Sequence, residues 1–258
     1  MLRFRSLGSG SSGNATVVEA SCGHQVTRLL IDCGLGLRDL GHRLQRAGLA
    51  ASDLDAIFIT HEHSDHIGCA KSLALRQRLP VWMSHGTHSA IGSPDFDGLL
   101  RLATDATAID LGALQLMPFT VPHDAREPLQ LTCTDGAARL GVLTDLGHAT
   151  AHVMQQLAGC HALLIESNHD AGLLAASAYP SFLKKRVGGA WGHLENTRTA
   201  DILRGLHHPA LRRVVAAHLS ERNNRADLVQ TALGAALGCA PAEIGVAHPL
   251  DGTAWESA

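Results

Sequence analysis

The sequence predicts an α/β fold, in which the buried strands of a sheet alternate with helices. Short apolar runs rich in strand-forming residues recur along the chain, with helical segments or polar turns between them. Polar side chains gather where several of these runs end, which is where ligands bind in open α/β sheets. The clearest case is the segment 60–66, which follows the apolar run 54–59 and contains three histidines and one aspartate.

The overall composition agrees with one large folded unit. A chain of 258 residues is within the range of single large α/β domains. A hydrophobic content of 45% is enough for a sizeable core, and because aromatic residues make up only 3%, that core must be mainly aliphatic. No repeat, low-complexity linker or break in composition divides the chain. We therefore expect a single domain over residues 1–258.

Charge and cysteine content limit the compartment and the partners that we expect. The net charge of −3 gives no global attraction to nucleic acid, so any such contact must use a local basic patch. The absence of an apolar run of about 18 residues argues against a membrane span. The N-terminus lacks the apolar segment of a secretory signal, and the six cysteines form no Cys-x-x-Cys pair. We expect a cytoplasmic protein with reduced thiols, and the sequence leaves its oligomeric state open.

The N-terminal segments are predicted to form three strands and a surface helix, over residues 2–7, 16–19, 28–31 and 37–49. The glycine- and serine-rich loop 8–14 is either a hairpin turn or a loop beside the site that offers N–H groups to an anionic substrate. Ser11 and Asn14 are its candidate site residues. Asp32 ends the third strand, where it either accepts a hydrogen bond that steadies the motif loop or simply forms a turn.

The segment 60–66 has the spacing of a metal-binding turn. A turn at a strand end can bring His61 and His63 around one ion, while Asp65 and His66 reach a second ion nearby. Imidazole and carboxylate donors together suit Zn²⁺ or Mn²⁺, and also iron. The alternative, a polar loop that collects these residues by chance, fits one histidine much better than three. A predicted helix over 67–75 and a strand over 81–83 complete a β-α-β unit with parallel strands.

Three more candidate ligands follow later strands. His123 comes just after the predicted strand 114–121, and His218 follows the clearly buried strand 213–217. Asp145 ends the second strand of a predicted hairpin, whose turn contains Asp135 and Gly136. Its carboxylate can bridge two cations, one oxygen to each, or it can cap the helix that begins near residue 149.

The remaining polar clusters each allow a structural and a functional interpretation. Asn168 and His169 follow the predicted strand 161–166 and are candidates for supporting the site or contacting substrate. The cationic stretch 184–186 is either a solvated face or a contact for a phosphate backbone. His193 precedes the predicted helix 197–206, where it is either structural or donates a hydrogen bond or a proton during catalysis. A helix over 226–237 and a strand over 244–247 complete the chain.

The pattern His61-x-His63-x-Asp65-His66 resembles the signature of the metallo-β-lactamase superfamily of metal-dependent hydrolases. This resemblance implies an αββα sandwich, with two mixed sheets flanked by helices, and a site for two divalent ions. It also implies that His123 completes the first metal site. The second site would then be formed by Asp65, His66, Asp145 and His218.

Local patterns narrow the resemblance to the YycJ/WalJ-like branch, which is described as double-stranded DNA 5′-to-3′ exonucleases. These patterns lie at residues 9–14, 60–63, 144–148, 166–170, 192–194 and 218–221. The histidine–helix element at His193 and the closing His-x-Ser are also similar to ribonuclease Z. One residue departs from the branch, because Glu195 stands where a small polar residue is expected. A carboxylate there would repel a phosphate or tune His193.

The sequence thus gives the hypothesis of a metal-dependent phosphodiesterase, in which Asp65 accepts a proton from the attacking water and His193 stabilises the developing charge. The resemblance implies a nucleic acid substrate, with duplex DNA favoured over RNA. A hydrolase of small thioesters or lactones on the same metal centre is the alternative. A metal-binding protein without catalytic activity is a third class, and the complete ligand set argues against it.

Overall fold

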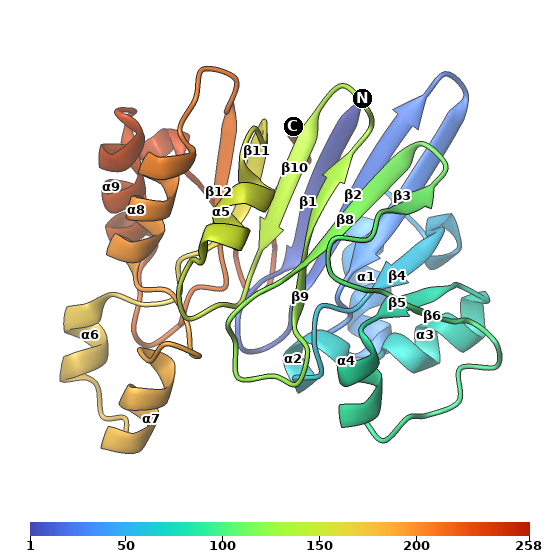
Figure 1. Cartoon of the computed structure of the whole chain (residues 1–258), viewed down its shortest axis with the longest axis horizontal. Helices are drawn as coiled ribbons and strands as arrows, with labels where there is room; N and C mark the ends of the chain where they lie inside the picture. The colour runs from blue at the N-terminus through green and yellow to red at the C-terminus, as the bar shows by residue number, and fades with distance from the viewer.

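Two mixed sheets packed face to face, with helices on their outer faces, form the protein. The structure is a computed structural model and describes all residues 1–258. Figure 1 shows the two sheets side by side, with α3 beside one of them and α8 and α9 beside the other. None of the helices has the length and apolar character that a membrane crossing requires.

The strands of the first sheet are β1 (Leu2–Gly8), β2 (Ala15–Cys22), β3 (Gln25–Ile31), β4 (Ala56–Phe58), β5 (Val81–Met83), β6 (Leu100–Leu102) and β14 (Glu256–Ser257). Their order is β14-β1-β2-β3-β4-β5-β6. The strands from β14 to β3 pair antiparallel, whereas β3, β4, β5 and β6 run parallel. The β-α-β unit around the histidine-rich segment therefore has the parallel strands that the sequence predicts.

The strands of the second sheet are β7 (Ile109–Leu111), β8 (Leu114–Thr120), β9 (Leu129–Thr134), β10 (Arg139–Leu143), β11 (Ala162–Glu166), β12 (Arg213–Ala217) and β13 (Gly245–Val246). They lie in the order β13-β12-β11-β10-β9-β8-β7. The four strands from β10 to β13 run parallel, and the others pair antiparallel. Both sheets thus combine an antiparallel part with a parallel part.

The helices are α1 (Leu37–Arg46), α2 (Ser64–Ile67), α3 (Ala70–Gln77), α4 (His85–Ala90), α5 (Ala151–Leu157), α6 (Ala171–Ala176), α7 (Ser181–Val187), α8 (Asn196–Leu206) and α9 (Ala226–Leu237), with short 3₁₀ turns at Ala51–Asp53 and Pro241–Glu243. Helices α1 and α3 cover the first sheet, whereas α5, α8 and α9 cover the second. Helices α6 and α7 project from one end of the molecule (Figure 1).

Three apolar clusters hold these layers together. The first lies between the sheets and includes Phe58 from β4 and Val142 from β10. The second joins the first sheet to α1, whose Leu40 and Leu44 share one helical face because they are four residues apart. The third joins the second sheet to its helices and includes Leu203 of α8. Helix, sheet, sheet and helix therefore form the four layers of the αββα sandwich, which confirms the predicted fold class.

The parallel strands of both sheets end at one edge of the sandwich. The histidine-rich segment begins directly after β4, and Asp145 follows β10. Asn168 and His218 follow β11 and β12 in the same way. Because parallel strands present their carboxyl ends on one side, residues that are far apart in sequence meet there.

Some predicted elements need correction. The predicted helix 67–75 is two helices, since α2 starts within the motif at Ser64 and ends at Ile67, before α3 begins. Gly68 separates them with a φ of 24°, and a Cβ there would lie only 2.4 Å from the Cys33 carbonyl oxygen. The short edge strands β6, β7 and β14 and the short helices α4, α6 and α7 were not predicted, because their local sequences carry weak signals.

Replacing Phe58 by alanine tests the contact between the sheets. The side chain is fully buried directly before the histidine-rich segment, so we expect Phe58→Ala to lower the free energy of unfolding by about 3–5 kcal/mol. Urea denaturation measures this change. Leu102→Ala is the control, because Leu102 is 51% exposed and its truncation should change stability by no more than about 0.5 kcal/mol. Equal midpoints for the two variants would contradict the packing described here.

Candidate metal centre

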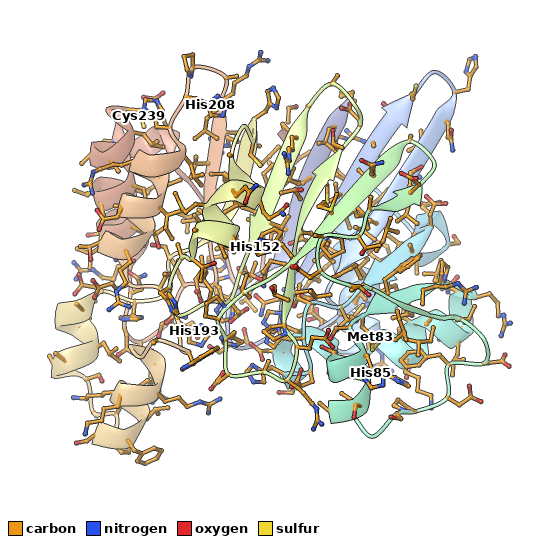
Figure 2. The ribbon with its side chains drawn as sticks, in the orientation of Figure 1. Met83, His85, His152, His193, His208 and Cys239 are labelled. Carbon is orange, nitrogen blue, oxygen red and sulfur yellow. The ribbon has the colours of Figure 1, made fainter.

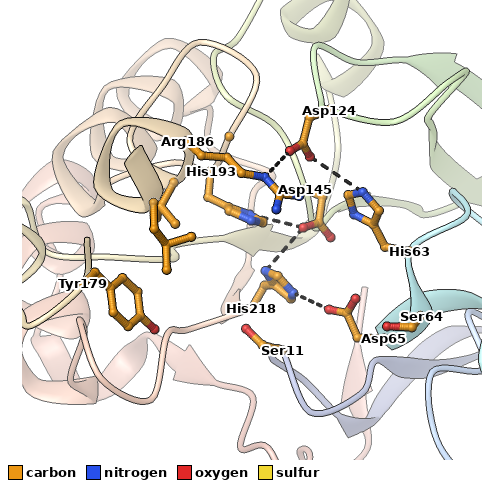
Figure 3. Close-up of a pocket in the computed structure, with 13 residues that line it drawn as sticks. Ser11, His63, Ser64, Asp65, Asp124, Asp145, Tyr179, Arg186, His193 and His218 are labelled. Carbon is orange, nitrogen blue, oxygen red and sulfur yellow. Dashed lines mark hydrogen bonds and ion pairs between the residues drawn. The ribbon is translucent and has the colours of Figure 1, made fainter. Parts of the chain in front are cut away.

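The seven predicted ligands lie together at the edge where the parallel strands end. They form overlapping groups whose potential ligand atoms lie within 4.8 Å of one another: His61, His63 and His123; His61, His66 and Asp145; and Asp65, His66 and His218. Figure 3 shows His63, Asp65, Asp145 and His218 around one pocket. Other histidines lie away from this cluster; for example, His208 is near the upper edge of the view in Figure 2, whereas His193 is in its lower half.

The first group consists of three imidazoles from two sheets. His61 Nε2 lies 3.0 Å from His63 Nδ1, and His123 Nε2 lies 3.3 Å from the same atom. His61 and His63 follow β4 of the first sheet, while His123 follows β8 of the second. His61 and His123 are buried and His63 is partly exposed, so the group is reached from the pocket side.

The second group combines two imidazoles with a carboxylate. Asp65 Oδ2 lies 3.6 Å from His66 Nε2 and 3.5 Å from His218 Nε2. Asp145 lies between the two groups, with Oδ2 3.0 Å from His66 Nε2 and Oδ1 3.9 Å from His123 Nε2. The carboxylate of Asp145 can therefore reach both groups. It is not a helix cap, because the Thr150 side chain caps α5.

Asp32 orients two of the histidines. His66 donates from Nδ1 to Asp32 Oδ2 at 2.8 Å, which leaves Nε2 as the nitrogen that points to the cluster. The Thr60 hydroxyl lies 3.0 Å from both oxygens of Asp32 and 3.0 Å from His61 Nδ1. A hydroxyl that donates to Asp32 accepts from His61, so Nε2 of His61 also faces the cluster. Asp32 thus has the supporting position that its place at a strand end suggested.

Two further histidines are oriented from the second sheet. His123 donates from Nδ1 to the Gly192 carbonyl at 3.1 Å, and His218 Nδ1 lies 3.3 Å from Glu166 Oε1. In both residues Nε2 is again the atom free for a ligand. His63 differs, because its Nδ1 faces the other imidazoles and its Nε2 lies 3.7 Å from Asp124. Protein hydrogen bonds therefore select the ligand nitrogen of four of the five imidazoles.

The buried carboxylates control the protonation of the second group. Burial alone would lower the pKa of His66, but Asp145 and Asp32 raise it to about 10. Burial likewise opposes the charge on His218, and Asp145, Asp65 and Glu166 raise its pKa to about 10. Burial would raise the pKa of Asp145, but His218 and His66 hold it well below its ordinary value. This group therefore strongly attracts positive charge.

The first group behaves in the opposite way. Burial, together with the neighbouring His66, keeps the pKa of His61 well below its ordinary value. Burial also lowers the pKa of His123. Neutral imidazoles are the form in which histidine binds a metal. The first group is thus prepared to bind a cation through neutral nitrogens.

The donor set fits divalent metal ions. Oδ2 of Asp145 is buried and has no hydrogen-bond donor, although it lies 3.0 Å from His66 Nε2. Because the pKa of His66 is raised, a proton on Nε2 balances the charge of this oxygen in the metal-free protein. A divalent ion that displaces this proton would bind both the ring nitrogen and the carboxylate oxygen. The nitrogen and oxygen donors suit Zn²⁺, Mn²⁺ or iron.

Glu166 is a site residue that the sequence analysis missed. It is fully buried at the end of β11, and its Oε1 accepts a hydrogen bond from His193 Nδ1 at 2.7 Å. Its Oε2 accepts the backbone N–H groups of Leu146 and Leu194 at 3.1 Å. Burial would raise the pKa of Glu166, but His193 keeps it below the ordinary value. A carboxylate that ends an apolar strand was the available signal.

Both candidate residues of the N-terminal loop, Asn14 and Ser11, lie near the cluster. Nδ2 of Asn14 lies 3.1 Å from His66 Nε2 and 3.4 Å from Asp65 Oδ2, so this side chain supports the second group. Ser11 lines the pocket. The loop between β1 and β2 is therefore both a connection within the antiparallel pair and part of the site wall.

The candidates near β11 and α8 are placed differently from one another. Asn168 Nδ2 donates to the His218 carbonyl at 2.9 Å and steadies that ligand loop. His169 does not line the pocket, and its backbone accepts from Asn196 and donates to Leu194. Glu195 also lies outside the pocket lining, where it accepts from the Thr197 hydroxyl at 2.6 Å. Glu195 therefore does not oppose a phosphate in the pocket.

A polar pocket opens over the cluster. Its volume is about 380 Å³, and three of its 13 lining residues are hydrophobic. Asp65, Asp145, His193 and His218 form its floor, while Tyr179 and Arg186 stand at its side (Figure 3). His193 is held with its Nδ1 2.7 Å from Glu166 and 3.2 Å from Asp145. Burial opposes the charge on His193, and Glu166 with Asp145 raises its pKa well above the ordinary value.

Comparison with known families agrees with this geometry. The family model described as "Beta-lactamase superfamily domain" matches residues 27–219, which include all seven candidate ligands. The chain belongs to the metallo-β-lactamase superfamily. It is a metallo-hydrolase of that superfamily, whose fold implies divalent metal binding.

Curated relatives extend the likeness along nearly the whole chain. Exodeoxyribonuclease YycJ of Bacillus anthracis is 30% identical over 240 residues, which cover 92% of this chain and 89% of the relative. Exodeoxyribonuclease WalJ of Streptococcus pneumoniae is 28% identical and covers 99% of this chain and 96% of the relative. Ribonuclease Z of Methanopyrus kandleri is 30% identical over only 38% of this chain and 37% of the relative. The resemblance to the YycJ/WalJ-like branch is thereby confirmed.

Several solved structures share the fold. The protein YhfI from Bacillus subtilis has a TM-score of 0.76 at 15% identity and covers 100% of this chain and 99% of its own. Zn²⁺-bound PqqB from Methylobacterium extorquens has a TM-score of 0.74 at 15% identity and covers 99% of this chain and 100% of its own. At these identities the likeness concerns the fold alone.

Replacing Asp32 by asparagine tests how the metallo-β-lactamase ligands are oriented. The introduced amide would present an N–H group to His66, which turns the ring to the tautomer with a protonated Nε2. We expect Asp32→Asn to weaken Zn²⁺ binding about 10–100-fold, measured by competition with a chromogenic chelator. Asp201→Asn is the control, because Asp201 is exposed on α8 and distant from the ligands. Unchanged affinity in Asp32→Asn would contradict the orienting role.

Proposed function

We propose that this protein is a two-metal phosphodiesterase that degrades duplex DNA from its 5′ ends. The observation that carries the proposal is the arrangement of the pocket floor. Asp145 lies within reach of both groups of metal-ligand candidates, 3.0 Å from His66 and 3.9 Å from His123, and a histidine that donates to a buried glutamate stands beside them. Phosphodiester hydrolysis needs a stabilised oxyanion, an acceptor for the proton of the attacking water and a donor for the leaving oxygen.

Seven residues would hold the two ions. His61, His63 and His123 would bind one, and Asp65, His66 and His218 the other, with Asp145 shared between them. Bound there, Zn²⁺ or Mn²⁺ would supply Lewis acidity toward the phosphate and toward the attacking water.

Asp65 is the group that we assign to take up the proton of the water. It is partly exposed in the pocket, whereas Asp145 and Glu166 are buried. The other accessible carboxylate there, Asp124, is paired with Arg186. Burial would raise its pKa, but the hydrogen bond from His218 lowers it, so Asp65 is ionised at neutral pH. An ionised carboxylate at the pocket floor is able to accept a proton as water attacks.

His193 is the group that we assign to the leaving oxygen. Its Nδ1 is engaged by Glu166 at 2.7 Å, so Nε2 is the nitrogen left for the substrate. The two carboxylates beside it keep the ring protonated, because they raise its pKa. A protonated ring in the pocket can stabilise the charge that develops on the leaving oxygen and then transfer a proton to it.

The choice of substrate rests on similarity and on the polar pocket. The two relatives that match most of the chain are named exodeoxyribonucleases. A pocket with mostly polar lining suits a phosphate group better than an acyl chain. RNA remains the alternative nucleic acid, since the shorter match is to a ribonuclease Z.

A substrate panel tests this proposal. Metal-loaded protein is incubated with end-labelled duplex DNA, single-stranded DNA, RNA and a set of thioesters and lactones. We expect mononucleotides to be released from the 5′ ends of duplex DNA. Asp65→Asn should lower the rate about 10²–10⁴-fold, because it removes the proton acceptor.

Asp110→Asn is the control, since Asp110 lies on the edge strand β7 and its activity should equal that of the wild type. Turnover of thioesters or lactones without any nucleotide release would refute the proposal. Full activity of Asp65→Asn would refute the role of Asp65.

The role of His193 is tested separately by changing the leaving group. His193→Gln should slow hydrolysis of DNA about 10²–10⁴-fold, because a nucleoside alkoxide needs a proton as it leaves. Hydrolysis of a nitrophenyl nucleotide ester should slow far less, because nitrophenolate leaves without taking up a proton. Steady-state rates on the two substrates give the comparison. An equal loss on both would show that His193 acts other than as a proton donor.

A further inference from the structure

We infer that residues 179–191, named here the α7 arm, bind an unpaired nucleic-acid strand beside the pocket. Exposed aromatic rings of the arm stack on bases, and its cations contact phosphates. The inference rests on the proposed function, because it names the part of the protein that holds the substrate of that pocket. No motif of the metal centre includes these residues.

The first observation is where the aromatic residues lie. The chain has five phenylalanines, three tryptophans and one tyrosine. The other four phenylalanines are buried in the core. Phe182 and Trp191 are 73% and 62% exposed. Tyr179, the third aromatic residue of the arm, lines the pocket. In a protein so poor in aromatic residues, three within one short exposed segment need an explanation beyond core packing.

The second observation is the charge of the segment. Two of the three lysines in the whole chain, Lys184 and Lys185, stand in α7 and are followed by Arg186. No aspartate or glutamate occurs anywhere in residues 171–194. The protein carries a net charge of −3, so this is a local cationic surface on an acidic molecule. Its charge is complementary to a phosphate backbone.

The third observation is that the arm borders the pocket. Leu183, Arg186 and Val187 of α7 line the pocket, and so does Tyr179 before the helix (Figure 3). Phe182 lies one helical turn before Arg186, and residues four apart share a helical face. At the other end of the arm, Trp191 is two residues from His193. Tyr179 and Arg186 therefore border the pocket, while Phe182 and Trp191 are exposed on the same arm outside the pocket lining.

The arm is not explained by its own packing. Helix α7 has no buried residue, and α6 before it buries only Leu174. Figure 1 shows both helices projecting away from the two sheets. Exposed rings on a helix without a buried face gain nothing for the core, but aromatic platforms beside a cationic track are typical of single-strand binding.

Arg186 is held over the pocket by the protein itself. Its Nε donates to Asp124 Oδ2 at 2.6 Å, and Oδ1 of that carboxylate lies 3.4 Å from His123 Nε2. This pair links the arm to the metal centre, and Nε is the only nitrogen of the guanidinium that donates a hydrogen bond within the protein. The terminal nitrogens have the planar fork geometry that binds a phosphate. The strand phosphate next to the scissile bond is the group that they would contact.

Oligonucleotide binding tests the inference without relying on cleavage. The full-length, metal-loaded protein is titrated into a fluorescent single-stranded phosphorothioate oligonucleotide, and fluorescence anisotropy gives the Kd. The variants are Phe182→Ala, Trp191→Ala, Trp191→Phe and Lys185→Ala. Leu102→Ala and Lys71→Ala are matched controls, because both residues are exposed and lie outside the arm.

We expect Phe182→Ala and Trp191→Ala each to raise Kd about tenfold, since loss of one stacked base is of that order. Trp191→Phe should keep most of the affinity, because it retains a ring. Lys185→Ala should lower the slope of log Kd against log salt by about 0.7, the value for one phosphate contact on a single strand. The controls should bind like the wild type.

Wild-type affinity in both aromatic-to-alanine variants, or no oligonucleotide binding by the wild type, would overturn the inference. Binding of vesicles rich in phosphatidylglycerol that depends on Phe182, with unchanged oligonucleotide affinity, would assign the arm to a membrane surface and overturn it as well. Nucleotide release by the wild type is measured in parallel. If release occurs while the arm variants bind normally, the inference fails and the proposed function stands. If release is absent while binding depends on the rings, the proposed function fails alone.

Discussion

The site depends on one buried carboxylate surrounded by imidazoles. Asp145 is 1% exposed, and histidine nitrogens approach it at 3.0, 3.2 and 3.4 Å. An ionised carboxylate is costly to bury unless positive charge and hydrogen bonds compensate it. The compensating groups come from both sheets. His66 follows β4 of the first sheet, whereas His193 precedes α8 and His218 follows β12 of the second sheet. The charge requirement of Asp145 therefore links the two halves of the sandwich at the edge where catalysis would take place.

Two other buried carboxylates orient the histidine rings of the centre. Asp32 is 2% exposed behind the first sheet's histidines, and Glu166 is fully buried behind those of the second. Each takes the Nδ1 side of a ring and so leaves Nε2 for the cluster. Because a ring turned to the other tautomer would lose its ligand atom, these outer carboxylates constrain the site as strongly as the ligands do. The ligands alone would not specify it.

The sequence predicted those parts that depend on local spacing. That the seven candidate ligands lie together was predictable, because they follow apolar strands and parallel strands end on one side. The role of Glu166 was not predictable, because a carboxylate at the end of an apolar run is common at ordinary strand ends. Its role depends on the hydrogen bond from His193, which comes later in the chain. The break at Gly68 was also hidden, because it arises from close contact with Cys33, which is remote in sequence. Edge strands such as β14 depend on a neighbouring strand rather than on their own two residues.

The candidate metal centre determines the type of chemistry but not the substrate. Divalent ions bound there would activate water against phosphodiesters, thioesters or lactones alike, so the candidate ligands suit a hydrolase and do not select its substrate. Solved structures at 15% identity share the whole fold, and a fold by itself does not select a substrate. Selection must come from side chains around the pocket. On this protein those are Tyr179 and the cationic, ring-bearing α7, which the core does not require. Substrate choice is therefore expected to change with this segment, while the ligand cluster stays the same.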